Sequence, residues 1–95
     1  MRVISRRALK DFSQHHPDCY SRLDQWYRIT RKANWASLID VQKDFNHAEA
    51  AGRLTVFNIK GNAYRLVARI NYRTRKVFVR RVMTHNEYEK GAWKE

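Results

Sequence analysis

The sequence predicts an α+β fold in which helices come first and an antiparallel sheet follows. In residues 6–45 apolar side chains recur every three or four positions, the spacing of one helix face. Residues 54–83 instead contain β-rich runs with alternating side chains, separated by turn residues. A chain of 95 residues with 43% hydrophobic content supplies one core, so we expect a single domain over residues 1–95.

The N-terminal part predicts a short strand followed by a helical hairpin. Residues 1–4 are apolar enough for a strand, and Ser5 is a suitable N-cap for a helix over residues 6–14. Pro17 ends this helix, because the residue before a proline avoids helical dihedral angles. We expect Asp18 to cap a second helix. The apolar stripe of that helix comprises Leu23, Trp26, Tyr27 and Thr30.

A third, short helix is predicted after Trp35. Ser37 followed by Asp40 resembles a capping box, weakened because the reciprocal residue is Asp rather than Glu or Gln. The buried face of this helix would contain Leu38, Val41 and Phe45. Residues 47–52 are then expected to form an irregular connection to the strands.

The second half predicts a meander of three antiparallel strands over residues 54–59, 63–72 and 76–83, to which residues 1–4 add a fourth. Lys60, Gly61 and Asn62 form a hairpin signal between the first two strands. In the second strand, alternation places Tyr64, Leu66, Ala68, Ile70 and Tyr72 on the core side. Arg65 and Arg69 then lie on the opposite face.

The third strand is apolar on both sides, with Arg80 and Arg81 as its only internal charges. Thr84 and Glu87 have the spacing of a capping box and predict a short C-terminal helix. Because the predicted helices can cover only one face of the sheet, we expect the face that carries the arginines to be free for binding.

The distribution of charge favours a polyanionic partner. The chain has a net charge of +11, and residues 50–86 contain nine Lys and Arg but no Asp or Glu. Such a field attracts nucleic acid. No apolar run is long enough to cross a bilayer, so we expect a cytoplasmic protein that does not bind membranes. A single cysteine, Cys19, excludes an internal disulfide and has no zinc-ligand spacing around it.

His85 is the strongest candidate for proton transfer. It follows the basic third strand directly, and an imidazole exchanges a proton near neutral pH. Tyr88 lies about one helical turn further on. Arginines on adjacent strands could bind successive phosphates. The spacing of His85 and Tyr88 alone does not establish catalysis. We expect the other three histidines, His15, His16 and His47, to be solvated.

Four blocks of sequence, residues 56–62, 64–67, 77–80 and 82–89, resemble the HigB family of bacterial toxins, within the RelE/ParE superfamily. The resemblance implies a helical hairpin packed on a twisted antiparallel sheet, with a short C-terminal helix. It also implies an mRNA interferase, an endoribonuclease that cleaves messenger RNA on the ribosome. The implied partner is a cognate antitoxin, a HigA-like helix-turn-helix protein, and operator DNA would be bound only through the toxin–antitoxin complex.

The resemblance also implies site residues. The catalytic candidates are Arg65, Arg80, His85 and Tyr88. The candidate RNA contacts are Lys60, Asn62, Arg69, Arg73 and Arg81. Arg69 and Arg81 occupy variable positions in the family, so we expect them to be auxiliary contacts. Arg80 is expected to matter more than Arg81, because alternation sends the two to opposite faces. Glu89 stands where the family usually has Asp.

The implied chemistry requires no cofactor and no metal. The ribose 2′-hydroxyl attacks its own phosphorus, which needs a base, an acid and a cation for the developing charge. His85 suits proton transfer and the arginines suit the charge, whereas Tyr88 could orient the phosphate, stack on a base or share the proton transfer. Two alternatives stay open: an inhibitor of DNA gyrase with the same fold, and a basic nucleic-acid-binding module.

Overall fold

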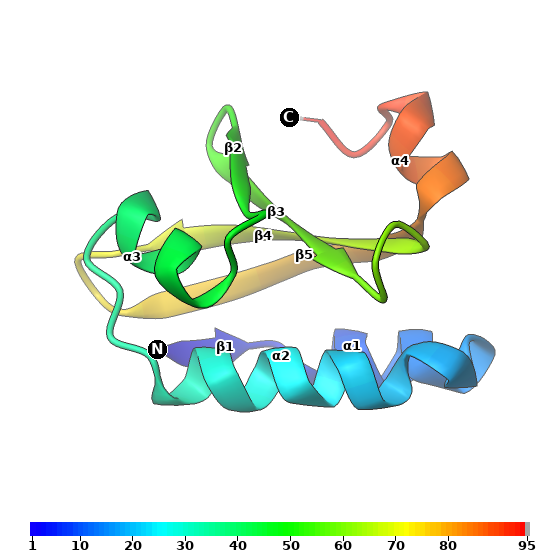
Figure 1. Ribbon diagram of the computed structural model, residues 1–95, viewed down its shortest axis with the longest axis horizontal. Coiled ribbons are helices and arrows are strands. Elements are labelled where there is room, and N and C mark those ends of the chain that lie inside the picture. Colours follow the sequence, from blue (N-terminus) through cyan, green and yellow to red (C-terminus); the bar gives the residue numbers. More distant parts are fainter. Residues whose placement is uncertain (95) are drawn as a thin grey trace.

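The computed structural model describes residues 1–94 and confirms the predicted α+β class. One sheet lies between the helices α1 and α2 on one side and α4 on the other (Figure 1). The elements in chain order are β1 (Arg2–Ile4), α1 (Arg6–His15), the 3-10 turn η1 (Pro17–Cys19), α2 (Tyr20–Lys32), α3 (Leu38–Asp44), β2 (Glu49–Ala51), β3 (Leu54–Ile59), β4 (Tyr64–Asn71), β5 (Lys76–Thr84) and α4 (His85–Lys90).

The sheet has the strand order β1-β5-β4-β3-β2 and is mixed rather than purely antiparallel. The β3–β4 and β4–β5 pairs are antiparallel, as predicted, and the unpredicted β2–β3 pair is also antiparallel. β1 runs parallel to β5, with Val3 opposite Val77. β2 forms inside the segment that was expected to be irregular, with Glu49 opposite Val56. Its sequence Glu-Ala-Ala has low β-propensity, so pairing with β3 rather than local preference makes it a strand.

The larger core lies between the helices and the sheet. Leu23 and Trp26 of α2 are almost fully buried against Phe57, Leu66 and Val77 of the strands. The predicted alternation of β4 is confirmed. Four residues of β4 belong to this core, together with Tyr72 directly after the strand. The β4 residues are Tyr64, Leu66, Ala68 and Ile70.

Two predicted helix caps differ from the structure. Asp18 does not cap α2: it lies in η1, and its carboxylate accepts hydrogen bonds from Lys60 Nζ at 2.8 Å and from the Tyr64 hydroxyl at 2.8 and 2.9 Å. A charged partner makes the stronger hydrogen bond, so it outcompetes the backbone N–H groups of α2. The predicted box at α3 does not form: Asp40 accepts from the Ala36 N–H instead of the Ser37 N–H, and the Ser37 side chain makes no cap bond. Ser5 caps α1 as predicted.

The arginine face of the sheet is partly covered, contrary to expectation. A second, smaller apolar cluster lies there. It contains Leu54, Val56, Val67, Met83 and Trp93, with Ala51 and Tyr88 packed against it. α4 and the segment after it fold back over the sheet (Figure 1), and Trp93 was part of no predicted element. The apolar residues of β5 therefore serve two cores, which is why its alternation looked ambiguous.

A β-bulge changes the orientation of residues in β5. Val67 lies opposite Arg81 and Ala68 lies opposite Val79, so Arg80 is an extra residue between the two pairs. Opposed residues share a face of the sheet, and Arg81 therefore lies on the face of Val67 and Arg65. The prediction that alternation sends Arg80 and Arg81 to opposite faces is thus wrong, because the extra residue of a bulge interrupts the alternation of side chains along the strand.

Candidate active site

Arg65 of β4 is the centre of the candidate site. Its Nη1 donates to the backbone oxygens of Asn62 at 3.2 Å and Tyr64 at 3.1 Å, and its Nη2 donates to the side-chain oxygen of Asn62. Only 7% of the residue is exposed. Asn62, predicted as an RNA contact, therefore holds the guanidinium group in place through the turn between β3 and β4.

Tyr88 of α4 covers Arg65 from the other side. The guanidinium carbon lies 5.2 Å from the centre of the Tyr88 ring, and that ring stacks on Trp93 at 4.9 Å. Trp93 Nε1 donates to the Tyr88 backbone oxygen at 2.8 Å, and the Tyr88 hydroxyl donates to Glu49 Oε1 at 3.5 Å. Burial, with the nearby carboxylate of Glu49, raises the pKa of Tyr88. Tyr88 is consequently a neutral phenol and a hydrogen-bond donor at physiological pH.

The positive charge of Arg65 has no acidic counterpart. Among residues 1–94, no carboxylate forms an ion pair with it, and its partners are neutral amide oxygens and an aromatic ring. A buried charge that is balanced only by dipoles is costly unless an anion approaches it. The surroundings of Arg65 therefore favour binding of an anionic group such as a phosphate.

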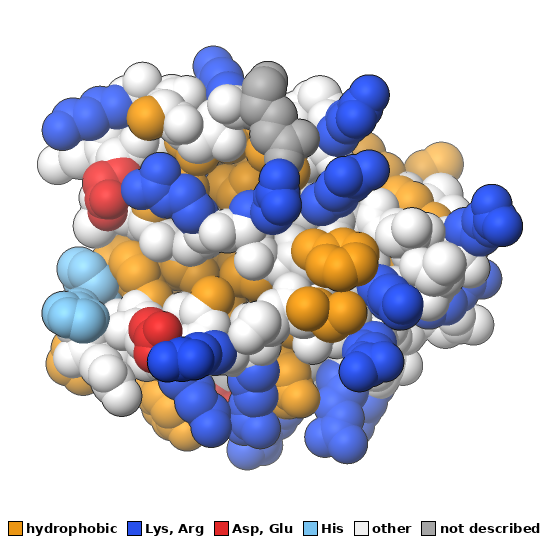
Figure 2. Space-filling model, turned by 180° about the vertical axis from the view of Figure 1, so that it is seen from behind, with side chains coloured by type: hydrophobic (Ala, Val, Ile, Leu, Met, Phe, Trp, Pro, Cys, Tyr) orange, Lys and Arg blue, Asp and Glu red, His pale blue; other side chains and the backbone are white. Residues whose placement is uncertain are grey.

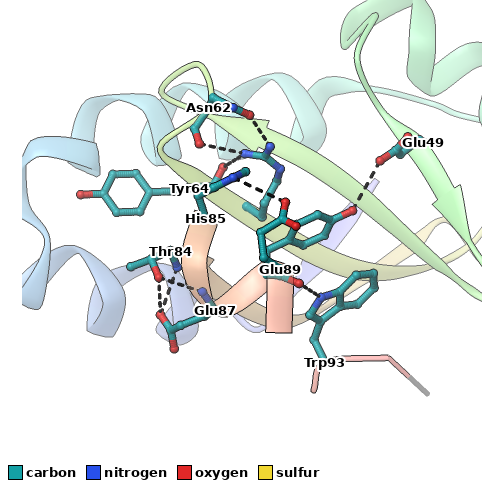
Figure 3. Close-up of polar contacts among 10 residues, drawn as sticks. Glu49, Asn62, Tyr64, Thr84, His85, Glu87, Glu89 and Trp93 are labelled. Atoms are coloured by element: carbon teal, nitrogen blue, oxygen red, sulfur yellow. Dashed lines mark hydrogen bonds and ion pairs between the residues drawn. The ribbon is translucent and has the colours of Figure 1, made fainter. Parts of the chain in front are cut away.

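His85 begins α4 beside this anion site. Its backbone N–H donates to Ala63 O at 3.0 Å, which attaches the start of α4 to the turn that carries Asn62. The predicted capping box of Thr84 and Glu87 is confirmed and fixes the same helix end. His85 Nε2 lies 3.4 Å from Glu89 Oε1, while Nδ1 is buried without a hydrogen-bond partner in the described chain. Figure 3 shows His85 among these contacts, with Tyr64 directed away from them.

The remaining basic candidates surround this centre at different distances. Arg80 is exposed at the bulge, and Arg81 Nη2 lies 3.7 Å from Glu87 Oε2. The hydrogen bond from the Thr84 backbone N–H is the largest cause of the lowered pKa of Glu87. Lys60 forms an ion pair with Asp18, and its hydrogen bond to Asp18 is the main cause of the lowered pKa of that carboxyl group.

Two predicted RNA contacts lie away from the centre. A strand rises ~3.3 Å per residue, so Arg69 lies ~13 Å from Arg65 along β4. Arg73 lies beyond the end of β4 at Asn71, in the turn to β5. Lys and Arg side chains extend over the rear face of the molecule, with few acidic groups between them (Figure 2). The structure therefore brings Asn62, Arg65, His85 and Tyr88 together and leaves Arg73 at the far end of the hairpin.

Comparison with known proteins gives the same family as the sequence blocks. Residues 19–91 match the HigB toxin family, described as the RelE-like toxic component of a toxin-antitoxin system. The chain belongs to the HigB family. It is 30% identical over 92 residues to the mRNA interferase toxin HigB of Escherichia coli K12, covering 94% of this chain and 88% of that protein. It is 23% identical over 93 residues to an mRNA interferase HigB of Escherichia coli O6:H1, covering 95% and 90%.

As a HigB-family toxin, the chain is one half of a toxin–antitoxin pair, and a cognate antitoxin is its partner. Within residues 1–94, no group of three or more His, Cys, Asp or Glu side chains is arranged to hold a metal ion. No helix in the same part of the chain is long and apolar enough to cross a membrane.

Sequence reasoning missed two residues of this HigB site. Trp93 supports Tyr88 by stacking, and its only signal is that a large aromatic side chain follows Tyr88 at a distance of five residues. Glu49 contacts the Tyr88 hydroxyl from β2. No local pattern indicates Glu49, because the contact joins residues 39 positions apart. His16, expected to be solvated, stacks on Phe12 at 4.3 Å.

Proposed function

We propose that this HigB-family chain is an mRNA endoribonuclease. The observation that carries the proposal is the buried guanidinium of Arg65, which has no acidic partner in the described chain and lies beside His85 and Tyr88. The relatives' names, mRNA interferase, support messenger RNA as the substrate. The basic residues of the second half supply the electrostatic attraction that a polyanion needs.

The proposed reaction uses the ribose 2′-hydroxyl of the message as the nucleophile. Its oxygen bonds to the adjacent phosphorus as its proton leaves, and the 5′-oxygen departs with a proton, which leaves a 2′,3′-cyclic phosphate. His85 takes part in proton transfer, because an imidazole ring can both accept and donate a proton. Arg65 and Arg80 stabilise the charge that develops on the phosphoryl oxygens. Tyr88, as a neutral phenol held against Arg65, donates a hydrogen bond to one of these oxygens.

The other basic candidates are proposed to hold the RNA backbone. Asn62 positions Arg65, while Lys60, Arg69, Arg73 and Arg81 are proposed to contact phosphates along the hairpin. Because the bulge removes the alternation argument, the ranking of Arg80 above Arg81 rests on the family pattern alone. The ion pair of Arg81 with Glu87 supports a role in holding α4 as well as RNA.

We further propose that cleavage depends on the ribosome and takes place in the cytoplasm. Free RNA does not hold its 2′-hydroxyl in line with the scissile phosphate, so much of the rate would come from the orientation of the message by the ribosome. The cognate antitoxin is proposed to be a HigA-like helix-turn-helix protein, and operator DNA would be bound only through the complex.

The experiment that tests the proposed function replaces His85 with Gln. His85→Gln keeps hydrogen bonding but removes the group that exchanges a proton, so cleavage of ribosome-bound messages should fall at least ~10²-fold. His15→Gln is the matched control, because His15 is exposed at the end of α1 and its ring hydrogen-bonds the Asp11 backbone oxygen. Arg80→Ala and Arg81→Ala belong in the same assay, with the larger loss expected for Arg80.

Full cleavage by a folded His85→Gln protein would refute the assigned role. Growth arrest without any cut message in the wild type would refute the nuclease itself. Such arrest would favour the gyrase-type inhibitor.

A further inference from the structure

A polar groove lies at the open edge of β3, next to the candidate active site. β2 begins at Glu49, opposite Val56, so residues 57–59 at the end of β3 have no partner in β2. The groove has a volume of about 340 Å³ and lies between α2, the segment after α3, and the turn between β3 and β4. The lining residues used below are Arg22, Gln25, Trp26, His47, Asn58 and Lys60.

The lining of the groove has the groups that a nucleobase requires. Phe45 supplies aromatic surface, and the His47 ring lies 6.1 Å from that of Phe45. The amides of Gln25 and Asn58 offer both donors and acceptors, which suits the mixed edges of a base. Aromatic surface combined with cationic side chains, here Arg22 and Lys60, is typical of single-stranded nucleic acid sites.

One wall of the groove contains a buried donor with no acceptor. Trp26 is 1% exposed, and its Nε1 has no hydrogen-bond partner among residues 1–94. The other two indoles are satisfied, since Trp35 donates to Asp44 at 2.8 Å and Trp93 donates to the Tyr88 backbone oxygen. Buried indole donors normally have an acceptor. The lone donor of Trp26 therefore points to a missing acceptor, and a base offers carbonyl and ring-nitrogen atoms.

The groove is adjacent to Arg65. Asn58 of the groove is the strand partner of Arg65, and paired Cα atoms lie ~5 Å apart. Lys60 and Gly61 line the groove and belong to the same turn as Asn62, which holds Arg65. His47 also lies close enough to Arg65 to be affected by its charge. The pKa of His47 is lowered mainly by desolvation and in addition by the positive charge of Arg65. An RNA strand with a phosphate at Arg65 would therefore have a neighbouring nucleotide at the groove.

We propose that this groove binds one base of the RNA strand near the scissile phosphate and thereby selects where the message is cut. The proposal rests on the nuclease function proposed above and names a specificity site for it. Arg65 and His85 would act on the backbone, which is the same in every sequence, whereas the groove would read the base.

The first experiment measures binding without cleavage. The probe is a short single-stranded RNA whose 2′-hydroxyls are methylated, added to the full chain while the Trp26 indole N–H signal is followed by NMR. We expect this signal to move with increasing RNA, because the indole gains an acceptor, while the amide of Thr74 in the far turn stays in place. An unchanged Trp26 signal, with Arg65 shifting on saturation, would overturn the proposal. So would an equal shift from the same strand lacking its bases.

The second experiment measures choice of the cut site. Asn58→Ala and Gln25→Ala remove amides from the groove, and Gln14→Ala is the control, since Gln14 lies at the end of α1 outside it. A wild-type preference for one base at a fixed distance from the cut should fall about tenfold in the groove variants, the discrimination carried by a few hydrogen bonds. An unchanged preference in both would overturn the proposal. A wild type that cuts no RNA would instead refute the nuclease function, whatever the Trp26 signal shows.

Discussion

The two faces of the sheet differ in how they are covered and in how their charges are balanced. On the helix side, Leu23 and Trp26 pack on Phe57 and Leu66 in a large core. On the other side, a smaller cluster around Val67, Met83 and Trp93 lies beside Arg65. The larger core lies on one face, and the candidate active site lies on the other.

The charges show the same division. Ion pairs at the surface of α1 and α2 join neighbouring turns of one helix, such as Arg28 with the half-buried Asp24 at 2.9 Å and Arg7 with Asp11 at 3.9 Å. Such pairs contribute little to stability. Arg65 has no acidic partner in the described chain and is buried, a condition that costs folding free energy and favours an anionic ligand. A fold commonly retains such strain where it serves function.

The largest effect should come from Arg65→Lys, which keeps the charge but cannot reproduce the three fixed hydrogen bonds and the stack on Tyr88. Single-turnover cleavage of ribosome-bound message should fall ~10²–10³-fold, the scale for one lost charge-stabilising donor. Arg28→Lys, the same change on the helix side, should leave the rate unchanged. Equal rates for both variants would break the contrast between the faces.

The opposite pattern is expected for Leu23→Ala in the helix-side core. A buried leucine that is only 1% exposed should cost ~2–5 kcal/mol of unfolding free energy when truncated. Urea denaturation measures this loss, while the cleavage rate per folded molecule should stay close to that of the wild type. A rate that drops in proportion to stability even under fully folded conditions would show that the two faces are not separable.

Antitoxin binding offers a third comparison of the faces. We expect the antitoxin to mask the arginine face with acidic or apolar groups, since residues 50–86 contain no acid and an acidic partner competes directly with phosphate. At ~100 times the dissociation constant, protection against amide exchange should rise up to ~10²-fold between residues 62 and 88. Protection confined to α1 and α2 would instead indicate indirect control, by exclusion from the ribosome.

The smallest expected effect concerns pH and the start of α4. The Thr84 N–H lowers the pKa of Glu87 from its usual 4.5, so the stabilisation is complete above that value and is lost as the pH falls through the lowered pKa. For this exposed group the loss should be only ~0.3–1 kcal/mol. Urea unfolding at about pH 6 and about pH 3 should show a smaller difference in Glu87→Gln. An identical pH dependence in both proteins would contradict the assignment.

The sequence was sufficient where neighbours along the chain decide the structure. The helical stripe with Leu23 and Trp26 is confirmed, and so is the alternation of β4 that separates Leu66 from Arg65. Both follow from periods of 3.6 and two. The HigB family was also predicted correctly, because its sequence blocks lie mainly in the strands and α4.

The failures involve contacts between distant residues. Asp18 was a reasonable helix cap by its local sequence, but Lys60 and Tyr64, more than 40 positions away, compete for its carboxylate. The bulge at Arg80 has no local signature, because the strand is apolar on both sides and either register appears consistent. In the site, the position of Arg65 was predictable, whereas the support of Tyr88 by Trp93 depends on how the chain folds back.

The turn between β3 and β4 joins three parts of the molecule that are distant in sequence. Its first residue, Lys60, is attached to the α1–α2 hairpin through Asp18. The side-chain oxygen of Asn62 accepts a hydrogen bond from the guanidinium of Arg65, and the backbone oxygen of Ala63 accepts one from the backbone N–H of His85. Because these contacts meet in one turn, we expect a tilt of the helical hairpin to displace the Arg65 guanidinium and the start of α4 together. We therefore expect that a protein bound only to the helices could inhibit the toxin without entering the groove proposed to bind RNA.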